Sequence, residues 1–534
     1  MTVFPTNTLT KGLGVLALLG ATAVTPLAAD AAGPKDTLRI AKYANAPALG
    51  DVFTNSGSPS QYWYGPLFDF ITLVDESGEL KPWLAESWQL VDPTTWRFKI
   101  RSGMEFSNGE KLDAAAVQAS LDWAINSEEG KGKGVGRQLI RAGIVSTALI
   151  GTDTIEIKTG QPNPLTGKEL FNVRVVAPRA WKEMGVKEYA KTPATSGPFK
   201  VESWSDTAAE YVRFDKSWRT SPLQRISYRV LPEEITRLQA LISEQVDLAI
   251  GMSPDNVGQI AKAGQKALIN RAPLDLSWVL LSEDAAHNYY LSQPGTKDAS
   301  RQARVSPFKD KRIRQAANMA IDQNAIVKDL LLGMGEPTNQ KANKFTFGYN
   351  AAVPKFEHNL DKAKQLLAQA GYPNGFDMAA EVYVGGIAKD KEIYEYAGSQ
   401  LSRIGIRTTV KALAFNEYFR KNQTGDIESW AFGLSMRYEP LMDPDFVLKS
   451  RSCIAAGPKY MCVPEMVPLI EAQSKEMDVE KRRKMLQELE MMTHDQATSL
   501  FLAGVPEIYG YNKRVSGLAV WNQRIQYDQI KLTD

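Results

Sequence analysis

The stretch DKAKQLLAQAGYPNGF, residues 361–376, is the most informative part of this 534-residue chain. It predicts a helix over residues 361–370 that Gly371 ends, because glycine readily takes the left-handed backbone that closes a helix. On both sides of it, short strands and helices alternate over the whole length of the chain. Such alternation is typical of an α/β protein.

Periodicity identifies the other strands and helices. Trp96, Phe98 and Ile100 alternate with charged residues, which predicts a half-buried strand. Asp113 then caps a helix whose apolar residues recur every four positions. Further strands are predicted at residues 155–157, 199–201, 226–230 and 406–410, and further helices at residues 237–243, 310–321, 322–332 and 391–403.

Length and charge limit the possible classes of protein. A chain of this size exceeds what one hydrophobic core usually organises, so we expect two or more domains. Its 63 basic and 61 acidic residues are interspersed, whereas a nucleic-acid-binding protein needs a concentrated basic surface. Two polar stretches, residues 126–136 and 284–306, are predicted to be loops. The first is expected to be a flexible surface insertion rather than a phosphate-binding loop.

The first 31 residues resemble a secretory signal peptide. A lone cation, Lys11, precedes an apolar run over residues 13–24, and the small residues Ala29 and Ala31 suit a signal peptidase. The run is too short to span a bilayer, which takes about 20 residues. Its glycines also disfavour the alternative of a buried helix. We therefore predict cleavage before Ala32 and a mature chain that is soluble in the periplasm.

Cysteines and histidines argue against a metal centre. Cys453 and Cys462 are the only cysteines, and an exported pair this close along the chain is predicted to form a disulfide. The histidines, His287, His358 and His494, are scattered and have no cysteine partner at a metal-binding spacing. We expect no metal and no other cofactor.

Catalytic motifs are equally scarce. The sequence contains no GxSxG nucleophile elbow, no HExxH, no phosphate-binding loop and no dinucleotide fingerprint in a strand-to-helix context. Carboxylate pairs without a defined spacing are expected to be solvated. The chain is therefore predicted not to be an enzyme.

A series of segments resembles the extracytoplasmic solute-binding proteins of family 5, the peptide- and nickel-type binding components of ABC importers. The residues 361–376 match that family almost word for word. Five further segments match in the same order: Leu84 to Trp88 with the following strand and Arg101 to Leu112, Thr195 to Phe199, Arg237 to Ile250, and Pro307 to Ile326. Glycines such as Gly103 and Gly109 also have a plain structural use in turns.

This resemblance implies a fold and a function. The fold is the two-lobed periplasmic binding protein fold of type II with an extra subdomain, in which hinge-connected lobes close over a ligand. We assign residues 32–75, 195–275 and 497–534 to lobe I, residues 76–194 to its inserted subdomain and residues 276–496 to lobe II, with hinges near residues 275 and 497. The expected function is capture of a small polar solute and its delivery to an inner-membrane ABC permease by a monomeric protein.

The resemblance also implies which segments bind the ligand. Family members use a loop that corresponds to residues 55–64, a strand-end loop at residues 381–386 and a segment at residues 430–446. Flat walls for a peptide backbone, a sugar ring or an opine-like conjugate are expected from aromatic residues of these segments, namely Tyr62, Trp63, Tyr383, Trp430 and Tyr438. Core packing is the alternative for each of them. Asp443 and Asp445 are further candidate contacts.

Arg437 departs from the family pattern. Peptide binders commonly carry an aspartate in this region that pairs with the ligand's ammonium group, whereas this chain has Ser435-Met436-Arg437-Tyr438. A guanidinium favours an anionic group, because it pairs with a carboxylate through two hydrogen bonds. Arg437 is therefore a candidate anchor for an anion, and a rim residue paired with Glu439 is the alternative.

Other functions remain open at this point. A secreted hydrolase needs a nucleophile with a positioned base or a metal, and neither is visible in the sequence. A periplasmic chaperone or the binding subunit of a sensor shares the expected fold. The identity of the ligand does not follow from the sequence.

Overall fold

The computed structural model describes residues 35–44, 50–54, 58–75, 77–292, 304–437, 441–521 and 524–533. The predicted signal peptide, residues 1–31, and its cleavage site before Ala32 lie outside the described residues. Tyr438 also lies outside them. Arg437 is described as part of a strand, without its side chain.

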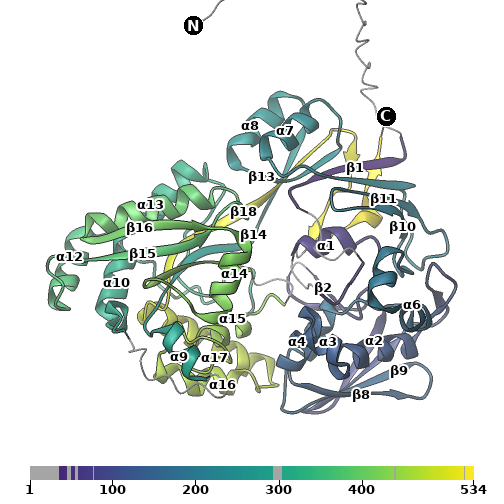
Figure 1. Ribbon diagram of the computed structural model, residues 1–534, viewed down its shortest axis with the longest axis horizontal. Coiled ribbons are helices and arrows are strands. Elements are labelled where there is room, and N and C mark those ends of the chain that lie inside the picture. Colours follow the sequence, from purple (N-terminus) through teal and green to yellow (C-terminus); the bar gives the residue numbers. More distant parts are fainter. Residues whose placement is uncertain are drawn as a thin grey trace, which may run out of the picture.

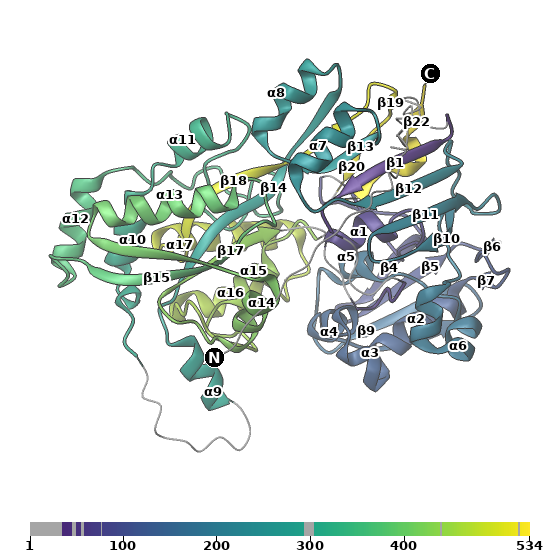
Figure 2. The same ribbon diagram turned by 45° about the horizontal axis from the view of Figure 1, so that its top comes forward.

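One ten-stranded sheet runs through the whole molecule in the order β10-β11-β12-β1-β13-β18-β14-β17-β15-β16. Its strands are β1 (Thr37–Lys42), β10 (Phe199–Trp204), β11 (Ala208–Arg213), β12 (Arg225–Val230), β13 (Leu248–Met252), β14 (Lys266–Leu280), β15 (Phe376–Tyr383), β16 (Ile406–Leu413), β17 (Ala431–Arg437) and β18 (Leu500–Tyr511). The central strands β14 and β18 are long and antiparallel, and Figure 2 shows them leading from one half of the molecule to the other.

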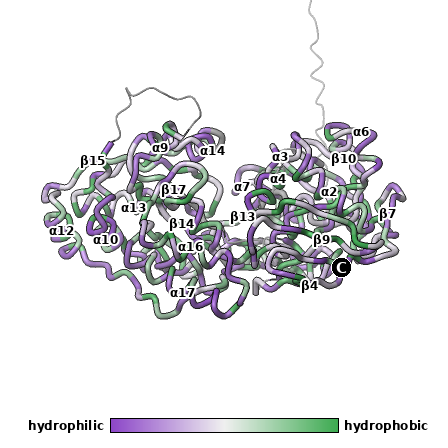
Figure 3. Tube along the Cα trace, turned by 90° about the horizontal axis from the view of Figure 1, so that it is seen from below, coloured by the Kyte–Doolittle hydropathy of each residue, from purple (hydrophilic) through white to green (hydrophobic). Residues whose placement is uncertain are grey.

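The two halves are lobes with separate hydrophobic cores. Lobe I contains β1 and β10 to β13, with α1 (Ser58–Tyr64), α7 (Glu234–Ile242) and α8 (Pro254–Lys262). Lobe II contains β15 to β17, with α10 (Lys311–Ala320), α12 (Leu360–Gln369), α13 (Asp390–Arg403), α14 (Phe415–Thr424), α15 (Asp445–Ser450), α16 (Val467–Gln473) and α17 (Val479–Asp495). The lobes lie side by side in Figures 1 and 3. The predicted two-lobed α/β fold is confirmed.

The strands β14 and β18 pass between the lobes where their pairing is interrupted. Asn270 lies opposite Glu507 and Leu274 opposite Val505, so three residues of β14 face one residue of β18. That one residue is Pro506, which has no N–H to donate to the sheet. Leu500, Leu502, Ala503 and Val505 pack in the core of lobe II, and Tyr509 packs in that of lobe I. The chain therefore passes between the lobes after Val505 on β18 and before Leu274 on β14. The hinges near residues 275 and 497 stay predictions.

A second sheet forms a subdomain of lobe I. It has four antiparallel strands in the order β4 (Ala85–Asp92), β5 (Thr95–Ile100), β9 (Thr154–Thr159) and β8 (Ile144–Ile150). It is accompanied by α2 (Ala114–Asn126), α3 (Glu128–Gly132), α4 (Gly134–Arg141) and α6 (Pro178–Lys191). All of these elements lie within residues 76–194, the range assigned to the inserted subdomain.

Most predicted elements are present with ends shifted by a few residues. The Asp113 side chain accepts a hydrogen bond from the Ala116 backbone and so caps α2 as predicted. The predicted helix over residues 322–332 is instead a short helical turn, α11 (Gln323–Ala325), followed by a wider π-type turn over residues 326–330. Within the polar stretch 284–306, residues 285–292 form helix α9 (Ala285–Ser292).

The prediction of a flexible loop at residues 126–136 is wrong. These residues form α3 and the start of α4, and the Ser127 hydroxyl caps α3 by accepting a hydrogen bond from the Gly130 backbone. The glycines allow close packing: a Cβ at Gly130 would lie 2.1 Å from the Trp123 carbonyl oxygen, and one at Gly136 would lie 2.1 Å from the Gly130 carbonyl oxygen. Glycine here serves packing between helices rather than flexibility.

The predicted disulfide is confirmed. Cys453 and Cys462 are bonded, with 4.5 Å between their Cα atoms, and they close a loop between α15 and α16. The remaining short elements are β2 (Leu73–Val74), β3 (Leu80–Lys81), β6 (Met104–Glu105), β7 (Lys111–Leu112), α5 (Thr166–Glu169), β19 (Val515–Ser516), β20 (Val520–Trp521), β21 (Arg524–Ile525) and β22 (Lys531–Leu532). Of the helices in the described ranges, none has the length and apolar character needed to cross a membrane.

Candidate functional site

The lobes meet where a segment of lobe II enters a hydrophobic cluster of lobe I. Met442, which precedes α15, is 1% exposed and packs in a cluster with Phe70, Leu73, Val74 and Phe171. The rings of Phe70 and Phe171 stack with centroids 4.7 Å apart. In Figure 1, α15 occupies the side of lobe II that faces β2 and α4. Any separation of the lobes must withdraw Met442 from this cluster.

Polar contacts also join the lobes. The Lys168 ammonium group donates a hydrogen bond of 3.2 Å to the Leu441 carbonyl oxygen. The Lys389 ammonium group of lobe II forms an ion pair with Asp255 of lobe I. Beside the Met442 contact, burial raises the pKa of Glu169 to about 7, against a hydrogen bond from Gln138 that lowers it. The lobe interface thus contains charged groups as well as apolar ones.

A cluster of three buried arginines in lobe I adjoins the same interface. Arg174 is 0% exposed, Arg524 2% and Arg219 7%. The guanidinium carbons of Arg174 and Arg524 lie 5.2 Å and 5.0 Å from the centroid of the Phe70 ring. Phe70 belongs to the cluster that receives Met442. The two cations are therefore separated from the lobe contact by one aromatic ring.

Only Arg219 of the three has carboxylate partners in the described ranges. Its Nε lies 2.8 Å from an Asp69 oxygen, and its Nη1 lies 3.2 Å from an Asp528 oxygen. None of the three side-chain nitrogens of Arg174 has a hydrogen-bond partner among the described residues. Burial lowers the pKa of Arg174 to about 10. Burial, together with the charge of Arg219, lowers that of Arg524 to about 9.

A second polar cluster surrounds Tyr62, one of the predicted ligand contacts. The Tyr62 hydroxyl donates to a Glu507 oxygen at 2.6 Å, and the Tyr509 hydroxyl donates to the other oxygen at 2.6 Å. The Lys42 ammonium group lies 5.0 Å from the centroid of the Tyr62 ring. Burial lowers the pKa of Lys42 to about 7, although Glu507 opposes the shift. Tyr62 is 0% exposed, and its hydroxyl is engaged within lobe I.

Trp63 and Trp430, the two predicted tryptophan walls, each pack against the hydrophobic core of a single lobe. Trp63 is 0% exposed and packs in the core of lobe I, with its ring centroid 5.3 Å from that of Tyr228. Trp430 precedes β17, whose first residue lies opposite Leu280 and whose last residue, Arg437, lies opposite Leu274. At about 3.3 Å per residue, Trp430 and Arg437 are separated by roughly 20 Å along the strand.

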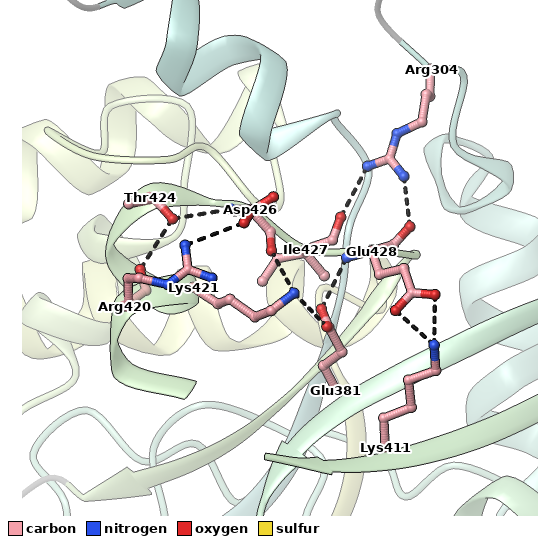
Figure 4. A network of polar contacts seen from close by, with 9 residues as sticks. All are labelled: Arg304, Glu381, Lys411, Arg420, Lys421, Thr424, Asp426, Ile427 and Glu428. Carbon is pink, nitrogen blue, oxygen red and sulfur yellow. Dashed lines mark hydrogen bonds and ion pairs between the residues drawn. The ribbon is translucent and has the colours of Figure 1, made fainter. Parts of the chain in front are cut away.

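Glu381, the first residue of the predicted ligand-binding segment 381–386, is held from within lobe II, as Figure 4 shows. The Glu381 carboxylate, 1% exposed, accepts hydrogen bonds from the Lys421 ammonium group at 2.7 Å and from the Glu428 backbone at 2.9 Å. Lys411 and Arg304 fix Glu428 in turn, through its carboxylate and its carbonyl oxygen. These bonds tie the segment before β17 to β15 and β16.

Tyr383 ends β15 on the side toward which β17 runs, since the two strands are parallel. Its ring is half-buried against Tyr418, with centroids 5.9 Å apart. The backbone N–H groups of Gly385 and Gly386 donate to the Asp390 carboxylate. Among the predicted aromatic contacts that lie within the described ranges, Tyr383 is the one whose ring is only partly covered at this end of the sheet.

The two predicted aspartates have partners in lobe II. The Asp443 carboxylate receives two hydrogen bonds from the Arg482 guanidinium group, at 2.6 Å and 2.8 Å. Asp445 accepts from the Gln473 amide at 2.6 Å and pairs with the Lys449 ammonium group at 2.9 Å. Asp443 is buried, whereas Asp445 is partly exposed.

A small pocket lies beside the strands that cross between the lobes. Its lining includes Asp275, Glu336, Thr338, Lys344 and Gly504. No sequence pattern predicted this pocket. No group of three or more His, Cys, Asp or Glu side chains in the described ranges is arranged to hold a metal ion.

The arginine cluster did not emerge from the sequence patterns, although a signal exists. Arg174 is the single charged residue in the run Leu170 to Ala177, whose members are all buried. A cation within a buried run is expensive unless it has a partner. A lone charge in an otherwise apolar run of this kind therefore indicates a buried cation with a specific role.

Comparisons with known proteins agree on one family. The profile described as bacterial extracellular solute-binding proteins, family 5 (middle region), matches residues 79–450. The chain is 23% identical over 415 residues to heme-binding protein A of Haemophilus influenzae, covering 73% of this chain and 72% of the relative. It is 25% identical over 422 residues to the glutathione-binding protein GsiB of Salmonella paratyphi A, covering 77% and 75%. The fold is similar to that of the periplasmic binding protein DppA of Helicobacter pylori in complex with the peptide STSA, with a TM-score of 0.76, 19% identity and coverage of 93% and 98%.

Proposed function

Because the chain belongs to the bacterial extracellular solute-binding proteins of family 5, we propose that it captures a small polar, peptide-like or related solute between its lobes and delivers it to an inner-membrane ABC permease. Members of this family bind solutes and are not enzymes. The proposal includes the finer points expected from the sequence: a periplasmic location after removal of residues 1–31, and action as a monomer.

The observation that carries this proposal is the way the lobes are joined. Two paired strands, β14 and β18, connect them, and beyond the strands they meet through the Met442 cluster and a few polar contacts. Such contacts separate without disturbing either core. A ligand that touches both lobes therefore stabilises the closed arrangement by mass action.

The names of the relatives give the range of solutes. Heme, glutathione and a tetrapeptide differ in size and shape, so the family alone does not define this chain's solute. All three carry free carboxylate groups. Tyr383, Arg437 and Tyr438 remain proposed contacts, because β15 and β17 end on the same side of lobe II.

Closure of the lobes is the first expected result. Protein purified with its natural solute should have a smaller radius of gyration than the same protein after unfolding, dialysis and refolding without the solute. Returning the solute at a hundredfold excess over its dissociation constant should add about 2.7 kcal/mol of stability. Small-angle scattering and thermal unfolding measure the two effects, after native mass spectrometry has weighed the bound solute. An unchanged radius in the two states contradicts capture by closure.

Arg437→Ala tests the proposed anchor of lobe II. If Arg437 pairs with an anionic group of the solute, the variant should lose about 2–3 kcal/mol of binding free energy while the empty protein keeps its melting temperature. Titration calorimetry of both proteins with the purified solute measures this. Arg420→Ala, on the exposed face of α14 near Asp426, is a control of equal charge change. Equal affinity of the Arg437 variant and the parent protein assigns Arg437 to the rim.

A further inference from the structure

We propose that the solute is anionic and that Arg174 of lobe I receives its negative group beside Arg524, at the face that Met442 of lobe II covers. This inference rests on the proposed function and narrows the class of solute. A carboxylate or phosphate group is meant, since both accept the parallel hydrogen bonds that a guanidinium group donates.

The first argument is the balance of charge. Arg174, Arg219 and Arg524 contribute three positive charges, and the carboxylates nearby, those of Asp69 and Asp528, contribute two. Both carboxylates bond to Arg219, and Asp69 also accepts hydrogen bonds from the indole N–H groups of two tryptophans. One buried positive charge therefore has no negative counterpart among the described residues.

The second argument is the cost of leaving Arg174 without hydrogen bonds. Its guanidinium group is fully buried, and its contacts in the described ranges are with the faces of two rings, at 4.9 Å from the Tyr64 centroid and 5.2 Å from the Phe70 centroid. Cation–π attraction recovers less than the desolvation of a charged group costs. An anion that binds beside Arg174 therefore offsets the desolvation cost of its guanidinium group, and this pairing favours binding of the anion.

The third argument is position. Arg174 is bridged to Phe70 through the backbone, and the Phe70 side chain packs in the cluster that receives Met442. When the lobes separate, Met442 leaves and Phe70 loses its cover, so the guanidinium group behind it becomes reachable. The cation is thus placed where a solute entering between the lobes meets lobe I.

Arg174→Met is the direct test, because methionine fills a similar volume without charge. Replacing a buried, unpaired cation by an apolar side chain should leave the melting temperature of the empty protein unchanged or raise it. Affinity for an anionic solute should fall about a hundredfold or more. Arg225 is a surface arginine that pairs with Glu202, and Arg225→Met is the matched control. It should change neither the melting temperature nor the affinity for the solute.

The measurements use the full mature protein and defined probes. Native mass spectrometry compares the solute retained by the parent protein and by both variants. Calorimetry then uses that solute, and also glutathione against its diethyl ester, which lacks both carboxylates. We expect the retained solute to contain a carboxylate or phosphate group, and we expect Arg174→Met to lose it. If the parent protein binds glutathione, the diethyl ester should bind much more weakly.

The outcomes separate this inference from the proposed function. A bound solute without an anionic group, or equal binding by Arg174→Met and the parent protein, overturns the inference and leaves solute capture intact. A melting temperature several degrees lower in empty Arg174→Met makes Arg174 a structural residue and also overturns it. A parent protein that retains no solute and binds neither glutathione nor a tripeptide such as trialanine contradicts both.

Discussion

Asp443→Ala is expected to lower the free energy of unfolding by about 3–5 kcal/mol, because it leaves the Arg482 guanidinium group charged and buried. Both side chains are inaccessible, at 0% and 4% exposure, and two hydrogen bonds join them. Burial by itself raises the pKa of Asp443, but Arg482 holds it below its usual value. The stability from this pair is therefore present above the pKa of an unfolded aspartate and is lost as the pH falls through the lower, folded value.

Chemical denaturation at neutral pH measures the loss. The matched control is Asp445→Ala, two residues away, whose carboxylate is partly exposed; that variant should lose no more than about 1 kcal/mol. The comparison also decides the predicted ligand role of Asp443. If Asp443→Ala has normal stability but binds the solute more weakly, Asp443 contacts the ligand and does not stabilise the fold.

Trp63→Ala is expected to cost about 3–5 kcal/mol of stability, the usual loss for a fully buried large aromatic side chain. The Trp63 ring lies parallel to that of Trp204 at 6.5 Å and edge-on to that of Tyr211 at 6.1 Å, all within the core of lobe I. Removing it leaves a cavity that neighbouring side chains from three strands and a helix cannot fill without moving.

Thermal and denaturant unfolding of Trp63→Ala and of Trp88→Ala check this expectation. Trp88 lies on β4 and is only partly buried, so its removal should cost clearly less. At permissive temperature the Trp63 variant should bind solute with nearly parental affinity, because the ring lies in the core. If Trp63→Ala has normal stability but binds the solute more weakly, Trp63 contacts the ligand.

The fold was predictable because its signals are local. The cap at Asp113, the glycine that ends the helix over residues 361–370 and the alternation from Trp96 to Ile100 each depend on a few neighbouring residues. The error at residues 126–136 has the same origin: glycine usually interrupts helices, and only the contact of Gly130 with the Trp123 carbonyl shows why it is tolerated there.

The candidate site was less predictable because it depends on distant segments. Sequence periodicity does not distinguish a core tryptophan from one that lines a cleft: Trp63 is covered by residues around positions 204, 211 and 228. Asp443 is a plausible ligand contact by sequence alone, whereas in the fold Arg482, 39 residues later, lies beside it. The excess charge of Arg174 emerges only when Asp69, Arg219 and Asp528 are counted together.

The paired strands between the lobes have a consequence for recognition by a partner. β14 and β18 stay hydrogen-bonded on both sides of the interruption opposite Pro506, so the lobes cannot wander independently as they would on flexible linkers. In the proposed function, rotation of the lobes takes place at this one short stretch of paired strands. A partner that touches both lobes then meets one spacing between them in the loaded protein and another in the empty protein. Such a partner distinguishes the two states by distance, without contacting the solute.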